Sequence, residues 1–121
     1  MLIHKGRLSG RTRYAVLEVI KFDKESDVHF VASGFGEKSD WFLNISKNPD
    51  VKINTAGKIM AVNAQVLGRD NAQMVFEEYN SRYPHAIKNL ARLIGYDIGN
   101  SRQDTLEFLK LIPVVAFYPV G

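Results

Sequence analysis

Apolar and polar residues in the first part of the chain are arranged as in β-strands. Residues 13–22 (RYAVLEVIKF) carry apolar side chains on both sides of an extended backbone, which predicts one strand covered on both faces. The polar residues 23–27 connect it to a second predicted strand at residues 28–35, so the two should form a hairpin. Residues 51–55 and 59–67 predict another hairpin, because their apolar positions recur at every second residue.

After the fourth predicted strand, the apolar positions follow the period of amphipathic helices. A first helix should open at Asp70, where Gln73 is placed to complete a capping box. A second helix should begin at Pro84, which fits a first helical turn, and end at Gly95. A third helix is expected at about residues 101–110. This part of the chain therefore predicts a block of helices.

A short helix and a closing strand complete the predicted elements. Ser39 or Asp40 can cap a helix that runs through Ile45 and that Asn48-Pro49 should end. Residues 114–118 have the composition of a last strand. Strands with the helices gathered in one block indicate an α+β fold of about five to six strands, in one domain over the 121 residues. Antiparallel hairpins of this length favour closure into a barrel, which would hide the strand edges.

The composition of the chain excludes several kinds of catalytic and metal site. The chain has no cysteine, which excludes disulfides, thiolate catalysis and cysteine-ligated zinc. His4, His29 and His85 lie in no metal-ligand spacing, so we expect surface or hydrogen-bonded histidines and no metal. No apolar run is long enough for a transmembrane helix, and the first residues lack the apolar segment of a signal peptide, so we expect a cytoplasmic protein. The net charge of +3 favours anionic partners.

A basic, glycine-containing loop near the amino end is the first candidate site. Residues 6–11 (GRLSGR) combine two glycines, which permit tight turns, with a hydroxyl at Ser9 and arginine side chains at Arg7 and nearby Arg13. Backbone donors, a hydroxyl and fixed positive charge are what a phosphate requires. The alternative is a solvated basic loop. Nucleic-acid binding is less favoured, because the basic residues gather in one loop without a stripe of aromatic residues.

Two further segments are candidates for binding a flat ligand. The small residues at 31–36 (VASGFG) allow a planar group to approach the backbone, although an ordinary strand end and turn would look the same. Trp41 is the only tryptophan and could form a wall of an aromatic site or anchor the core. Asn44 could line the same site or cap the end of its helix.

These motifs, in this order, resemble a known family. The series GRLSGRTR, VASGFG, SDWFLNISKNPDVKI and IPVVAFYPV is similar to the deazaflavin-dependent nitroreductase family of the split β-barrel, flavin-binding superfamily. The resemblance covers about residues 4–68 and 111–120. It implies a split antiparallel β-barrel with helices packed around it. It also implies the deazaflavin coenzyme F420, a hydride carrier that has a phosphate and an anionic tail.

The resemblance also implies a set of cofactor-binding residues. The basic loop would hold the phosphate or tail, the strand after it would follow the ring system, and the WxxN segment would line the cleft. By position, the implied residues are Arg7, Ser9, Gly10 and Arg13 for the loop, Val16 and Leu17 for the strand, Val31, Ala32 and Ser33 at the ring and phosphate, and Trp41 and Asn44 in the cleft. Ser33 is also the candidate catalytic residue, as a donor that stabilises charge developing on the substrate, and a tyrosine or a water molecule is the alternative donor.

The chain departs from the family at two positions. Family members commonly carry lysine where this sequence has Leu8 and Gly34. Both lysines would face the anionic end of the coenzyme, so binding of the tail should weaken unless Arg11, Lys38 or Lys5 substitutes for them.

We therefore expect an oxidoreductase that transfers a hydride from reduced F420 to a small electron-poor acceptor, such as a quinone, an activated alkene or a nitroarene. One alternative is the same barrel holding FMN, which has a single phosphate and would not need the two missing lysines. Another is a non-enzymatic module that binds a flavin, a lipid or haem. A homodimer through an open sheet edge is a further expectation.

Overall fold

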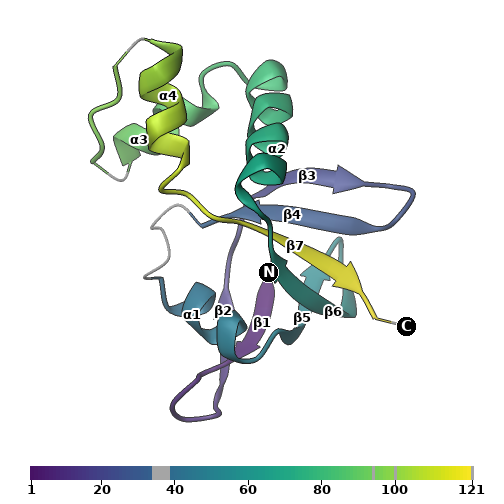
Figure 1. Ribbon diagram of the computed structural model, residues 1–121. Coiled ribbons are helices and arrows are strands. Elements are labelled where there is room, and N and C mark those ends of the chain that lie inside the picture. The colour runs from purple at the N-terminus through teal and green to yellow at the C-terminus, as the bar shows by residue number, and fades with distance from the viewer. Residues whose placement is uncertain (34–38, 94, 100, 121) are drawn as a thin grey trace.

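The computed structural model describes residues 1–33, 39–93, 95–99 and 101–120, whose strands form one antiparallel sheet (Figure 1). The described residues hold seven strands, and their order in the sheet is β2-β1-β5-β6-β7-β4-β3. Every pairing is antiparallel. The strands are β1 (Leu2–Lys5), β2 (Thr12–Ala15), β3 (Val19–Asp23), β4 (Val28–Ala32), β5 (Asp50–Thr55), β6 (Lys58–Val66) and β7 (Val114–Pro119).

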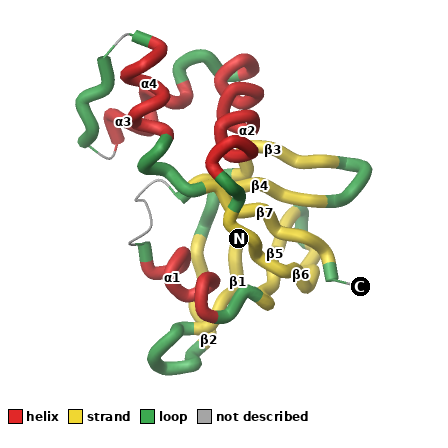
Figure 2. Tube along the Cα trace, in the orientation of Figure 1, coloured by secondary structure: helices red, strands yellow, loops and turns green. Residues whose placement is uncertain are grey.

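The helices lie in two places. Helix α1 (Asp40–Lys47) packs beside the strands at the amino end, and the loop between β1 and β2 projects next to it (Figures 1 and 2). Helices α2 (Arg69–Arg82), α3 (Ala86–Leu93) and α4 (Arg102–Leu109) form a separate block at the other end, with α2 against β3. The mixed α+β class predicted from the sequence is confirmed.

The predicted strand count and barrel closure are wrong. The sheet has seven strands and is not closed, because β2 and β3 each pair on one side only. The single strand predicted at residues 13–22 is in fact two strands at opposite ends of the sheet order. Between them the chain leaves the ladder, and Val16 is 89% exposed. Strand β2 pairs with β1, a strand that the basic composition of the amino end concealed.

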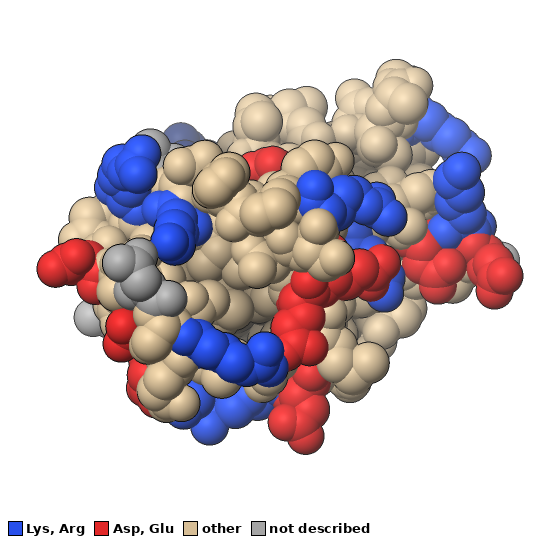
Figure 3. All heavy atoms as spheres, turned by 90° about the horizontal axis from the view of Figure 1, so that it is seen from above, with Lys and Arg blue, Asp and Glu red and all other residues tan. Residues whose placement is uncertain are grey.

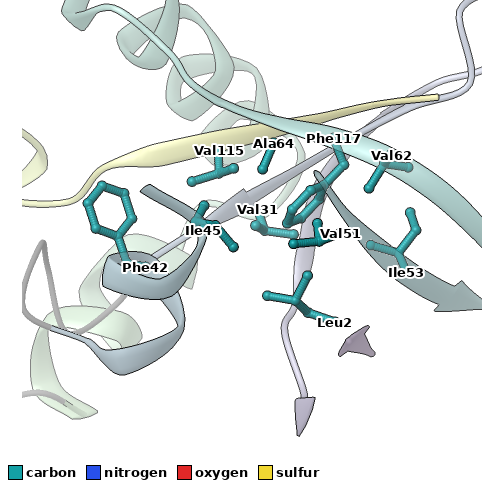
Figure 4. Close-up of a cluster of buried hydrophobic side chains, with 10 residues drawn as sticks. All are labelled: Leu2, Val31, Phe42, Ile45, Val51, Ile53, Val62, Ala64, Val115 and Phe117. Atoms are coloured by element: carbon teal, nitrogen blue, oxygen red, sulfur yellow. The ribbon is translucent and has the colours of Figure 1, made fainter. Parts of the chain in front are cut away.

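Two hydrophobic clusters stabilise the fold, one between the strands and α1 and one between the sheet and the helical block. Figure 4 shows the first, in which Phe117 lies among side chains from other strands and Ile45 and Phe42 project from α1. Strand β7 serves both clusters: Val115 and Phe117 belong to the first, and Val114 belongs to the second. Burial on both faces explains why this strand is a continuous apolar run.

The structure corrects two predictions about the helices, the cap of α2 and the first residue of α3. Helix α2 begins after Gly68 without a side-chain cap, and Gln73 Nε2 instead donates to Glu77 Oε1 at 3.3 Å. Helix α3 begins at Ala86, two residues later than Pro84 predicted. The start of α4 is as expected, because Ser101 Oγ accepts a hydrogen bond from the Asp104 amide at 3.0 Å. The predicted strand at residues 28–35 ends at Ala32, and residues 34–38 lie outside the described residues.

Charge is mixed over the surface of the helical end. Figure 3 shows basic and acidic side chains next to one another on this face, with apolar and neutral groups between them. Such a face creates no single-signed field for a polyanion such as nucleic acid. None of the described helices is both long and apolar enough to cross a membrane.

Candidate functional site

A hollow of about 510 Å³ lies between α1 and the β1–β2 hairpin, and it contains most of the polar side chains predicted for a binding site. Its wall comes from the loop after β1, from β2 and from one face of α1. The lining residues are His4, Gly6, Arg7, Leu8, Ser9, Arg13, Tyr14, Ala15, Asp40, Trp41 and Asn44.

The loop that borders this hollow is held by its own hydrogen bonds. The amides of Gly6 and Gly10 donate to the carbonyls of Arg11 and Gly6, each at 2.8 Å. The Arg11 amide donates to Ser9 Oγ at 3.2 Å. Gly10 has a φ of +70°, which favours glycine, and a Cβ at Gly6 would lie 2.8 Å from Ser9 Oγ, so a larger residue there would displace the hydroxyl. Because the amides of Gly6, Gly10 and Arg11 are already engaged, the arginine side chains and the Ser9 hydroxyl proton are the side-chain donors of this loop for an anion.

Arg7 is fixed at the mouth of the hollow by α1. Its amide and its Nη1 donate to Asn44 Oδ1, at 3.0 and 2.9 Å. Its carbonyl accepts a hydrogen bond from Lys47 Nζ at 3.2 Å, and its Nη1 lies 3.6 Å from Asp40 Oδ1. Asn44 itself is only 4% exposed. The asparagine predicted from the WxxN spacing therefore aims a guanidinium instead of capping its helix, whose last turn is capped by Asn48.

Trp41 has one face to the hollow and one to the core, and its role as the wall of an aromatic ligand site stays a prediction. It lines the hollow, and it also packs against the first hydrophobic cluster as a partly buried residue. Its ring meets Phe42 edge-on, with centroids 6.1 Å apart. Because Trp41 and Asn44 are three residues apart, they lie on one face of α1, which is the face turned to the hollow.

His4 is a buried residue of the hollow that sequence reasoning missed, as it also missed Tyr14, Ala15 and Asp40. It is 5% exposed, and its Nδ1 lies 3.1 Å from Asn44 Nδ2. Burial lowers the pKa of His4, and the positive charge of Arg13 on the paired strand lowers it further, while Asp40 acts in the opposite direction. One signal for it exists in the sequence: His4 stands two residues after the apolar Leu2, so both share the buried side of a strand.

The remaining predicted residues lie outside this hollow. Gly10 shapes the turn, and Val16 is exposed between β2 and β3. Leu17 and Val31 line a second hollow of about 190 Å³ on the other side of the first cluster. Ala32 packs against the cluster of the helical block.

Ser33 is fully buried, and its hydroxyl lies 2.9 Å from that of Ser39. It does not line the larger hollow. Its role as a donor to substrate stays a prediction. Gly34, where the family carries a lysine, lies outside the described residues, and Leu8 is 91% exposed at the rim.

A contact between the sheet and the helical block lies close to the exposed segment 16–18. Tyr79 of α2 donates its hydroxyl proton to Glu18 Oε1 at 2.9 Å. Burial and the carboxylate of Glu18 raise the pKa of Tyr79 to about 12, so the phenol stays protonated at neutral pH. Lys21 and Glu78 form an ion pair of 3.0 Å beside it. Among the described residues, no cluster of histidine and acidic side chains could hold a metal ion.

Solved structures share this fold. An F420-H2 dependent reductase (FDR-A) superposes with a TM-score of 0.64 at 18% identity, and the alignment covers 96% of this chain and 90% of the other. A domain-swapped dimer gives a TM-score of 0.62 at 18% identity, over 96% and 76% of the two chains. A third is a protein related to general stress protein 26 of B. subtilis, of the pyridoxinephosphate oxidase family, from Clostridium acetobutylicum. It gives a TM-score of 0.55 at 10% identity, over 98% and 72%. These likenesses identify the split-barrel type of fold.

Sequence comparison identifies the family. No curated protein matches the chain. A family model described as F420H(2)-dependent quinone reductase matches residues 1–97, which is most of the sequence. The matched range includes the basic loop, the exposed segment 16–18 and the WxxN helix. The chain therefore belongs to the F420H2-dependent quinone reductase family, a family of enzymes that use F420 as their cofactor.

Proposed function

We propose that this enzyme transfers a hydride from reduced F420 to a small quinone, with the anionic part of the cofactor held in the larger hollow. The observation that carries the proposal is that the clamped guanidinium of Arg7, the Arg13 side chain and the Ser9 hydroxyl all line one space of about 510 Å³. Bound F420 supplies the hydride. The protein supplies position, charge and a donor for the acceptor oxygen.

The donor set fits an anionic group. Arg7 and Arg13 provide two guanidinium forks, and Ser9 provides a hydroxyl proton. Among the described residues, no carboxylate forms a salt bridge with Arg13, and the carboxylate near Arg7, on Asp40, is 89% exposed. With Leu8 in place of a lysine, these two arginines would carry most of the attraction for the tail. FMN, with one phosphate, fits the same donors, but the family match favours F420.

The exposed segment 16–18 is the place we propose for the flat ring. Ala15 lines the larger hollow and Leu17 lines the smaller one, so Val16 lies on the path between them. Val16 is 89% exposed, and the chain there is not part of the sheet ladder. An apolar side chain beside backbone groups that lie outside the sheet ladder suits a heterocycle that has one apolar face and hydrogen-bonding edges.

Tyr79 is the proposed donor to the acceptor. Its hydroxyl lies at the segment 16–18, where its single proton is donated to Glu18 Oε1, so donation to a quinone requires the hydroxyl to turn from Glu18 to the quinone oxygen. A quinone oxygen that gains negative charge during reduction would be stabilised by such a donor. Tyr79→Phe should therefore lower kcat for quinone reduction by about tenfold while leaving the Kd for F420 unchanged. Tyr83→Phe, which alters the exposed ring 5.2 Å from that of Tyr79, is the matched control. Equal rates for the two variants would remove Tyr79 from this role.

Titration of the purified protein with F420 and with FMN tests the cofactor site. A charge-assisted hydrogen bond contributes about 1.5–3 kcal/mol, so Arg13→Ala should raise the Kd for F420 roughly tenfold to a hundredfold. Arg11→Ala removes the same charge from the same loop but from outside the hollow, so its effect should be smaller. An unchanged Kd in Arg13→Ala would contradict the anchor.

Turnover separates an enzyme from a binding module. Oxidation of reduced F420 should accelerate when a small quinone is added, and less when a nitroarene is added. Tight binding of F420 without this oxidation would favour the non-enzymatic alternative.

A further inference from the structure

Beneath the proposed anion site lie two buried polar side chains that the mechanism above does not use together. His4 of β1 is 5% exposed and Asn44 of α1 is 4% exposed, and forty positions of sequence separate them. Buried polar groups need hydrogen-bond partners, and these two satisfy one another on one side. The other side of Asn44 faces Arg7.

The hydrogen bonds fix how Asn44 is oriented. Its Oδ1 accepts two donors, the amide and the Nη1 of Arg7, at 3.0 and 2.9 Å. A flipped side chain would set its NH2 group against both of these N–H groups, which leaves three donors without an acceptor. The Asn44 NH2 group therefore lies 3.1 Å from His4 Nδ1.

This orientation of Asn44 determines the protonation state of the His4 ring. An amide NH2 can only donate, so His4 Nδ1 must carry a lone pair, and the ring must be neutral with its proton on Nε2. A protonated His4 would have N–H groups on both ring nitrogens and would face the Asn44 donor with a donor of its own.

The charged groups around His4 are consistent with this neutral state. Arg13 lies opposite His4 on β2, and Asp40 lies on α1. Lys52 of β5 pairs with Ile3, so it occupies the other face of the sheet. The nearby positive charges thus oppose protonation of the ring, and the exposed Asp40 offsets them in part.

We propose that neutral His4 is a positioning residue of the anion site: by accepting a hydrogen bond from Asn44, it holds the amide that aims Arg7 at the bound anion. If the proposed function holds, the anion is the phosphate or tail of F420. The inference rests on the proposed function only for the identity of this anion. His4 touches no substrate in this role, and its effect is transmitted through Asn44 to Arg7 and the loop.

Two replacements separate the hydrogen bond from the bulk of the ring. His4→Asn keeps an acceptor oxygen at the place of Nδ1, because both atoms are bonded to Cγ. His4→Leu replaces the ring by an apolar side chain of similar size, which offers Asn44 no hydrogen-bond acceptor. His29→Leu is the matched control: His29 is a buried histidine of β4, 7% exposed, and its Nδ1 has no partner in the described part of the chain.

The experiment measures the Kd for F420 and for inorganic pyrophosphate, together with Tm. His4→Leu should weaken the binding of both ligands by about tenfold, His4→Asn by about threefold or less, and His29→Leu should leave the Kd for pyrophosphate unchanged. In the unaltered protein, the nitrogen resonances of His4 should show an unprotonated Nδ1 and a protonated Nε2. This spectrum remains decisive even where His4→Leu does not fold.

The outcomes also distinguish the two proposals. If pyrophosphate binding follows the His4 pattern while F420 does not bind, the positioning role stands and the proposed cofactor site fails. A protonated Nδ1, an equal loss of affinity in His4→Asn and His4→Leu, or a Kd that His4→Leu leaves unchanged would each overturn the positioning role. Failure of the unaltered protein to bind either anion would do the same.

Discussion

At the residue scale, Arg7 already has one anionic neighbour that a cofactor must displace or accommodate. Asp40 Oδ1 lies 3.6 Å from Arg7 Nη1, and the Asp40 side chain is 89% exposed. An exposed pair of this kind contributes about 0–1 kcal/mol, so it does little for folding. Its carboxylate nevertheless repels any anion that approaches Arg7.

Asp40→Asn should therefore tighten anion binding. We expect the Kd for F420 to fall by about two- to fivefold at low ionic strength, and the gain should shrink as salt screens the charges. Asp40 is also the acidic residue in the first turn of α1, so its loss should lower stability by about 0.3–1 kcal/mol. Asp70→Asn, in the first turn of α2, is the matched control for charge and helix position. Fluorescence titration at several salt concentrations checks this, and equal Kd values for both variants would contradict it.

The residues of the site divide into those that sequence reasoning can find and those that it cannot. Arg7 and Arg13 were predicted from the clustering of charge in a glycine-containing loop, which is a local property, whereas the WxxN pair was expected to line the cleft because of the family resemblance. The contact of His4 with Asn44 joins β1 to α1 across forty positions, and no local pattern encodes it. The engaged amides of Gly6 and Gly10 could not be anticipated either, because the closure of the loop onto itself depends on the register of β1 with β2.

At the element scale, strands were predicted where alternation continues until a turn residue, as in β6. The break at Val16 has no glycine or proline to mark it. Both β2 and β3 are β-rich, and what separates them is their choice of partner, β1 for one and β4 for the other. Strand pairing depends on tertiary contacts that the local sequence does not show. The sequence therefore predicted a single strand, and this prediction was wrong.

The close approach of Gly6 to Ser9 in the β1–β2 loop can be tested by substitution. A Cβ at Gly6 would lie 2.8 Å from Ser9 Oγ, so Gly6→Ala should push the hydroxyl out of its bond with the Arg11 amide. We expect a stability loss of about 1 kcal/mol and weaker binding of F420. In Ser9→Ala the obstructing oxygen is gone, so adding Gly6→Ala to that variant should cost much less.

A double-mutant cycle by urea unfolding and F420 titration measures this coupling. Gly10→Ala is the control, because its cost arises from a φ of +70° and should be the same with or without Ser9. Strict additivity of Gly6→Ala and Ser9→Ala would mean that the contact does not shape the loop.

At the scale of the whole molecule, one strand joins the binding end to the helical end. Val115 and Phe117 of strand β7 belong to the hydrophobic cluster beside α1, and Val114 of the same strand belongs to the cluster beneath α2–α4. Polar contacts near the segment 16–18 add to this connection, since Tyr79 and Glu78 of α2 reach Glu18 and Lys21. Unfolding of the helical block should therefore disturb the place proposed for the ring, although the anion site lies at the opposite end.

Two buried histidines make the stability of the whole molecule depend on pH. Burial is the main cause that lowers the pKa of both His4 and His29 below the ordinary value of 6.5. In the window between these lowered values and 6.5, the unfolded chain binds more protons than the folded one, so the free energy of unfolding rises with pH. Stability should accordingly fall as the pH drops below 6.5 and level off once the folded-state histidines are also protonated.

Urea unfolding at a series of pH values from about 7.5 to about 5 measures this slope before most carboxylates titrate. His4→Asn should flatten part of it, because the asparagine keeps the hydrogen bond to Asn44 and takes up no proton. His29→Asn should flatten the rest. His85→Asn, which removes an exposed imidazole next to Pro84, is the matched control. A slope that His4→Asn does not change would show that the His4 ring binds protons equally in the folded and the unfolded chain, and that result would contradict the lowering of its pKa by burial and by Arg13.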